Sequence, residues 1–170
     1  MKTSGYQLRE AITMWKLRKT TAEGQFTDSL AKFAEETKDT PQAVVLAVQH
    51  AESNIVRLQV AQMKYNLAVK VSPLDLGEMS LAEAIKLSGV VSRIEKIWAG
   101  ASTANRSHYG GYNARVRDPQ QILAEATITS KEVLAETSRA TKHAGALRAA
   151  IGAGNTHEVE IEDLYAALFE

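Results

Sequence analysis

The residues best suited to chemistry lie in one segment, Ala104 to Asp118, which reads ANRSHYGGYNARVRD. It contains Arg106, Arg115 and Arg117, and no acidic residue precedes Asp118. A guanidinium group presents a planar fork of donors that matches phosphate or carboxylate oxygens. This Arg/Tyr segment, residues 104–118, therefore predicts a site for a small anionic ligand.

The other side chains of the segment suggest which anion. Tyr109 and Tyr112 are able to stack on a base, and Gly110 and Gly111 let the backbone approach a ligand closely. This mixture is typical of a site for a nucleotide-like molecule. The predicted ligand-binding residues are Arg106, His108, Tyr109, Tyr112, Asn113, Arg115 and Arg117. The alternative is that the arginines pair with carboxylates on adjacent helices and the segment is a solvated connector.

Catalytic and metal signatures are absent from the sequence. It contains no P-loop, GxGxxG, GxSxG or HExxH pattern, and none of the Glu-x-x-His pairs that a di-iron helical bundle needs. The chain has no cysteine, which excludes disulfides, thiolate zinc sites and cysteine nucleophiles. We therefore expect no catalytic residue, no metal and no cofactor.

The overall charge limits the partners. Lys plus Arg number 20 and Asp plus Glu number 20, whereas nucleic-acid binding calls for an excess of basic residues. The N-terminus lacks the apolar core of a signal peptide, and no run reaches the roughly 18 apolar residues of a membrane span. We expect a cytoplasmic protein with neither nucleic acid nor membrane as its partner.

Four stretches of helical periodicity would hold the segment in place. The first helix is capped by Thr3 or Ser4. The second, expected to be the longest, runs over about 41–69 with Thr40 as N-cap. The third starts at Ser80 with a capping box to Glu83 and ends near Gly100. The last covers about 130–150, after a capping box of Thr129 with Glu132. Residues 119–128 are left open between a short strand at 124–127 and a continuous helix.

These elements predict an all-α or mainly α fold. We expect an antiparallel bundle of three to four long helices, with a short irregular or β-hairpin segment around 105–128. The chain would form one helical-bundle domain over 1–170, with a functional loop at 104–118. A C-terminal tail at 155–170 would dock on the bundle or on a neighbouring subunit through Leu164, Leu168 and Phe169.

The second helix carries two apolar stripes. The first runs through Val44, Val48, Ala51, Ile55, Leu58, Gln62, Tyr65 and Val69, and the second through Val45, Val56, Val60, Met63 and Leu67. A helix that is apolar on two faces is usually buried on both. We therefore expect a homo-oligomer that assembles through the 41–69 helix, and expect Ile55→Asp to dissociate it.

Several stretches together resemble a family of small, uncharacterised bacterial and phage helical proteins often labelled septicolysin. They are the LREA opening at Leu8, the run IVRLQVAQMKYNLAV from Ile55, SLAEAI from Ser80, the Arg/Tyr segment, and LRAAIGAGN from Leu147. The resemblance implies an oligomeric helical fold. It does not imply pore formation, because no stretch of the chain is suited to membrane insertion.

Three functions follow as hypotheses. The first is a non-catalytic oligomeric protein that captures a nucleotide-like ligand, such as a phage sponge that sequesters a host's nucleotide immune signal. The second is a structural or protein-interaction helical oligomer without a small-molecule ligand. The third is a hydrolase or lyase acting on a nucleotide, with His108 as general acid or base.

Overall fold

The computed structural model describes residues 1–30, 39–110 and 128–169, with the backbone alone described for 102–110. The described residues form four long helices and two small two-stranded sheets, so they are mainly helical. The mainly α fold class predicted from the sequence is confirmed. Contacts divide the chain into two compact units, which are described separately. Unit 1 holds residues 1–71, 80–82 and 152–170, and unit 2 holds 72–79 and 83–151. A single domain over 1–170 stays a prediction.

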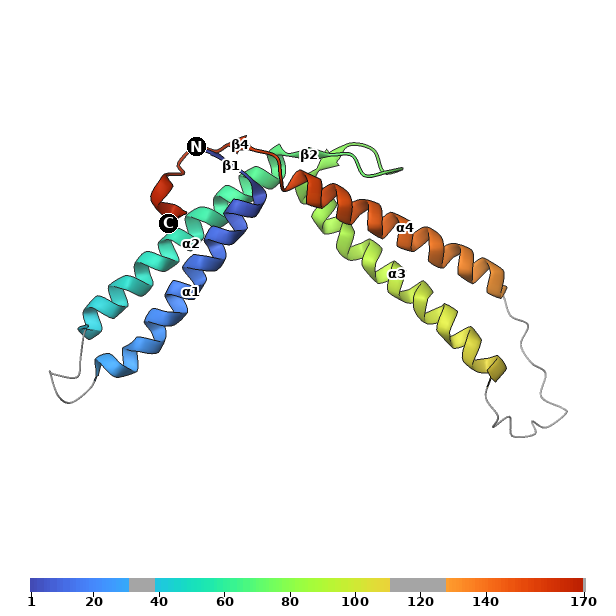
Figure 1. Ribbon diagram of the computed structural model, residues 1–170, viewed down its shortest axis with the longest axis horizontal. Helices are drawn as coiled ribbons and strands as arrows, with labels where there is room; N and C mark the ends of the chain where they lie inside the picture. The colour runs from blue at the N-terminus through green and yellow to red at the C-terminus, as the bar shows by residue number, and fades with distance from the viewer. Residues whose placement is uncertain (31–38, 111–127, 170) are drawn as a thin grey trace. The chain divides into compact units, whose positions relative to one another are not determined.

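Unit 1 is built on α1 (Gly5–Ser29) and α2 (Pro41–Ala68), which lie side by side and antiparallel (Figure 1). Ser4 caps α1 in a capping box with Gln7, because each side chain bonds the other residue's backbone N–H. Thr40 caps α2, and Pro41 occupies its first turn, where the missing N–H costs nothing. The predicted starts of both helices are confirmed.

The core of unit 1 forms where the two helices meet. From α1 it takes Leu8, Ile12 and Trp15, which are at most 7% exposed. From α2 it takes the first stripe, including Leu58 and Tyr65 at 0%. Ile55 of that stripe is only 5% exposed and belongs to this core, so the expectation that Ile55→Asp dissociates an oligomer stays a prediction. The sequence periodicity does not distinguish burial against α1 from burial against a second chain.

Unit 2 is built on α3 (Leu81–Gly110) and α4 (Ser130–Gly154), which are also antiparallel (Figure 1). The Thr137 hydroxyl on α4 donates to the Trp98 carbonyl on α3 at 3.2 Å. Before α4, Thr129 and Glu132 bond each other's backbone N–H at 3.2 and 2.7 Å. The capping box predicted there is confirmed.

Two predictions about α3 are wrong. The helix continues to Gly110 instead of ending near Gly100, and its 30 residues exceed the 28 of α2. A single glycine costs a formed helix only about 1 kcal/mol, and adding residues to a helix is easier than nucleating one. No further glycine or proline occurs before Gly110. Ala104 to Gly110 is therefore helical and does not belong to a loop.

Four short strands complete the described elements. β1 (Lys2–Thr3) pairs antiparallel with β4 (Val159–Glu160), with Lys2 opposite Glu160. β2 (Lys70–Val71) pairs with β3 (Met79–Ser80), and the Leu81 N–H donates to the Val69 carbonyl at 2.8 Å. The strand considered at 124–127 lies outside the described residues.

The C-terminal tail packs on unit 1 and ends in a 3-10 turn, η1 (Ala166–Leu168). Leu168 is fully buried, and its carbonyl accepts a 2.9 Å hydrogen bond from the Trp15 indole N–H. Leu168 of the tail therefore packs against Trp15 of α1. This contact spans 153 residues of sequence.

Candidate functional site

The Arg/Tyr segment is described only as backbone over 104–110, and the rest of it lies outside the described residues. The backbone of Arg106, His108 and Tyr109 belongs to the last turns of α3. Tyr112, Asn113, Arg115 and Arg117 fall in 111–127. The described residues include none of these seven side chains, so convergence of the segment on an anion stays a prediction.

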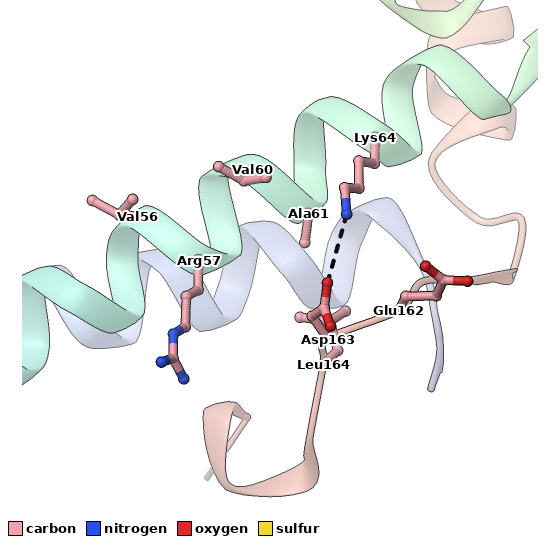
Figure 2. A pocket seen from close by; sticks show the side chains of 8 residues that line it. All are labelled: Val56, Arg57, Val60, Ala61, Lys64, Glu162, Asp163 and Leu164. Atoms are coloured by element: carbon pink, nitrogen blue, oxygen red, sulfur yellow. Dashed lines mark ion pairs between the residues drawn. The ribbon is translucent and has the colours of Figure 1, made fainter.

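The described part of the chain contains a groove that sequence reasoning missed. It lies in unit 1 between α2 and the C-terminal tail, with a volume of about 500 Å³ (Figure 2). We call it the tail groove. Its lining residues are Val56, Arg57, Val60, Ala61, Lys64, Glu162, Asp163 and Leu164. Two features of the sequence pointed to parts of this groove, namely the second apolar stripe of α2 and the C-terminal tail. That these two segments lie side by side depends on contacts between residues far apart in the chain.

Charges in the tail groove are balanced. Lys64 and Asp163 reach across it, with Nζ and Oδ2 3.8 Å apart (Figure 2). The Arg57 guanidinium donates to the Tyr165 hydroxyl at 3.1 Å and lies 6.0 Å from the centre of its ring. Arg57 and Lys64 are offset by Glu162 and Asp163. The groove therefore offers no concentrated positive charge for a phosphate.

The ion pair in the tail groove is weak. The side chains of Lys64 and Asp163 are 53% and 90% exposed, and exposed pairs contribute on the order of 0–1 kcal/mol. Asp163 also has a left-handed backbone with φ of 65°, a conformation that Asp tolerates better than most residues. The pair positions the tail loosely beside α2.

Other basic residues that could have joined an anion site have partners within unit 1. Lys19 of α1 bonds Glu52 of α2 at 2.6 Å and lies 3.6 Å from Glu23. The hydrogen bond to Glu52 is the largest of the effects that raise the Lys19 pKa above its ordinary 10.5. Arg18 stacks over the Trp15 ring at 4.6 Å. Lys19 links α1 to α2, whereas Arg18 packs on a ring of its own helix, and neither lines the tail groove.

The most extensive exposed apolar feature of α2 is its second stripe, which we call the α2 stripe. Its residues are Val45, Val56, Val60, Met63 and Leu67, exposed by 43, 55, 47, 64 and 63%. Val56 and Val60 also line the tail groove, where Figure 2 shows them on the side of the helix away from the tail. Arg57, Ala61 and Lys64 point towards the tail. The α2 stripe is therefore left open by both α1 and the tail.

Two classes of site are not found in the described residues. Over 1–30, 39–110 and 128–169, no group of three or more His, Asp or Glu side chains is placed to hold a metal ion. Within the same ranges, no helix combines the length and the apolar character needed to cross a membrane.

Comparison with protein-family models, with curated proteins and with solved structures finds no match to this chain. The resemblance to the septicolysin-labelled family therefore stays a prediction. What can be said of function comes from the residues and the geometry described above.

Proposed function

We propose that this protein is a non-catalytic, cytoplasmic, self-associating helical protein whose subunits meet through the α2 stripe. The observation that carries this proposal is the exposure of five large apolar side chains along one face of a helix whose opposite face is already buried. Single exposed apolar residues are ordinary on protein surfaces, but continuous apolar patches mark interaction sites. The proposal corresponds to the interaction-protein hypothesis from the sequence.

Unit 2 supports the proposal independently. Its buried apolar residues include three alanines, at 84, 140 and 144, so the contact between α3 and α4 buries few large side chains. Val90, Ile94 and Ile97 follow one another at helical intervals on α3 and are 43, 43 and 69% exposed. Most helical stability in proteins comes from packing an apolar face. The exposed face on α3 is therefore a separate apolar surface of the kind that self-association covers.

The test is the oligomeric mass measured over a range of concentrations by sedimentation equilibrium. We expect wild type to associate, and Val56→Asp or Met63→Asp to be monomeric, because each change buries an unpaired carboxylate at the interface. Leu17→Asp is the matched control. Leu17 is a 67% exposed residue on α1, outside the α2 stripe, so this variant should associate as wild type does. Circular dichroism checks that all variants keep their helices.

A monomeric wild type at every concentration would contradict the proposal. So would wild-type association in both α2 variants. Loss of association in the Leu17→Asp control would place the interface on α1 instead.

The second candidate is capture of a small anionic, nucleotide-like ligand by the Arg/Tyr segment, and it includes the phage-sponge form. The observation that favours it is sequence-based: three arginines and two tyrosines stand together with no acidic residue before Asp118. The tail groove does not compete for this role, because its charges cancel. Oligomerisation through α2 and ligand capture are compatible.

Native mass spectrometry after exposure to a metabolite extract tests this second candidate. A retained mass of a few hundred daltons is expected for wild type and should be lost in Arg115→Ala and Arg117→Ala, with the oligomer mass unchanged. Lys142→Ala, which removes an exposed cation from α4, is the control. Retention of the ligand in both arginine variants would refute capture by this segment.

A further inference from the structure

We infer that α2 pairs with α2 of a second copy in antiparallel orientation, about a two-fold axis that passes beside Val56. This inference rests on the proposed function, because it requires association through the α2 stripe. The stripe itself gives the orientation and the register, through the spacing of its residues and through the one charged side chain among them.

The spacing along this face of α2 is symmetric about Val56. Successive positions on the face are Val45, Gln49, Glu52, Val56, Val60, Met63 and Leu67. Their intervals are 4, 3, 4, 4, 3 and 4, which read the same in both directions. At about 100° per residue, these positions fall within roughly 80° of the helix circumference. The face is therefore narrow, straight and self-complementary, as the isologous contact of a two-fold dimer requires.

When the pair is centred on Val56, every apolar residue of the α2 stripe is covered by the second copy. Val56 meets Val56 of the second copy at the axis, and Val45 meets Leu67 at each end. Met63 lies against Gln49, and Val60 lies against the carbon stem of Glu52. An antiparallel register centred between residues 61 and 62 would pair only Val56 with Leu67 and Val60 with Met63, leaving Val45 uncovered. The Val56-centred register therefore buries more apolar surface.

Charge disfavours the parallel alternative. A parallel pair would match equal positions, so the two Glu52 carboxylates would face each other across the interface. In the antiparallel pair they stand eight residues apart along the axis, or about 12 Å. Glu52 is already bonded to Lys19 of its own α1 at 2.6 Å, so its carboxylate stays at the rim while its stem covers Val60. Antiparallel helix dipoles also attract, whereas parallel ones repel.

The absence of cysteine allows a clean cross-linking experiment on the full chain. Three variants are made, Val56→Cys, Val45→Cys and Leu67→Cys, with Glu10→Cys on an exposed face of α1 as control. Disulfides form when the two Cα atoms lie about 4.4–6.8 Å apart. We expect Val56→Cys to cross-link with itself at least tenfold faster than the control under mild oxidation. Val45→Cys and Leu67→Cys should each stay uncross-linked alone and form the mixed disulfide when combined.

The outcomes distinguish a failure of the antiparallel pairing from a failure of the proposed self-association. Self-cross-linking of Val45→Cys or Leu67→Cys as fast as Val56→Cys would overturn the antiparallel orientation and leave association through α2 standing. A mixed Val56→Cys and Leu67→Cys disulfide, without the Val56→Cys self-cross-link, would overturn the register. A monomeric wild type, with no variant faster than the Glu10→Cys control, would overturn both the pairing and the proposed function.

Discussion

Tyr65 joins α2 to the last residue of α4 and to the turn that follows it, and the Tyr65→Phe substitution tests how much this contact stabilises unit 1. The side chain is fully buried, and its hydroxyl lies 2.7 Å from the Gly154 carbonyl and 2.8 Å from the His157 carbonyl. Phe keeps the ring in place but removes the one donor that these two oxygens share. Leaving buried acceptors without their donor costs about 1–3 kcal/mol. For a chain of this length, each kcal/mol lowers Tm by about 2–4 °C.

The same substitution has a signature in alkaline solution. Burial raises the pKa of Tyr65 above its ordinary value of 10.0, against a smaller opposing effect of a hydrogen bond with the Gly5 backbone. In the unfolded chain, Tyr65 ionises first as pH rises. Its contribution to stability is therefore complete below pH 10 and is lost as pH rises through the folded-state pKa. Tyr65→Phe should lack this loss.

The assay is urea unfolding followed by circular dichroism at neutral pH and at several values between about pH 9 and 11. Lysines titrate in that range too, but equally in both proteins, so the difference between the two curves isolates Tyr65. Tyr6→Phe is the control, since Tyr6 is 48% exposed. If Tyr65→Phe unfolds within about 0.5 kcal/mol of wild type and shows the same alkaline slope, the hydroxyl contacts do not stabilise the unit.

Two further predictions concern the helices. Gly5→Ala should destabilise unit 1 by about 1–3 kcal/mol, because the added methyl meets the Asn155 side chain and comes within 2.9 Å of the Tyr65 ring. Gly24→Ala, with nothing within 4 Å, should instead stabilise α1 by about 0.5–1 kcal/mol, and chemical denaturation of both variants would show opposite signs. The backbone N–H and hydroxyl of Thr129 hold the pKa of Glu132 below its ordinary 4.5, so the stability that this carboxylate confers is present above that pH and is lost as pH falls. Glu132→Gln should flatten this acid dependence in thermal unfolding between about pH 3 and 7, and an unchanged profile would mean that the capping box does not stabilise α4.

Helix starts were predictable because capping is local. Ser4 with Gln7, Thr40 with Pro41, and Thr129 with Glu132 each act within four residues, so their chemistry is readable from the sequence. The end of α3 was not predictable in the same way. Gly100 looks like a stop signal, but a helix that is already formed extends through one glycine at small cost.

The two apolar stripes of α2 were also legible in the sequence, since helical periodicity alone defines them. The sequence does not show which of the two stripes is buried within the subunit, because both have the same helical period. Packing of α1 selected the face that contains Ile55, Leu58 and Tyr65, and left the face that contains Val56 open. The tertiary structure thereby places Ile55 in the core of unit 1 and leaves Val56 exposed.

For the candidate sites, the sequence by itself determined the cluster of arginines and tyrosines between Ala104 and Asp118, the absence of cysteine, and the helical periodicity. Only the tertiary structure decided that the C-terminal tail lies against α2, with Trp15 bonded to Leu168 and Lys64 facing Asp163. The physical reason is the distance along the chain over which each kind of interaction acts. Periodicity and capping act between near neighbours in the chain, whereas a groove depends on contacts between segments about a hundred residues apart, which no local pattern encodes.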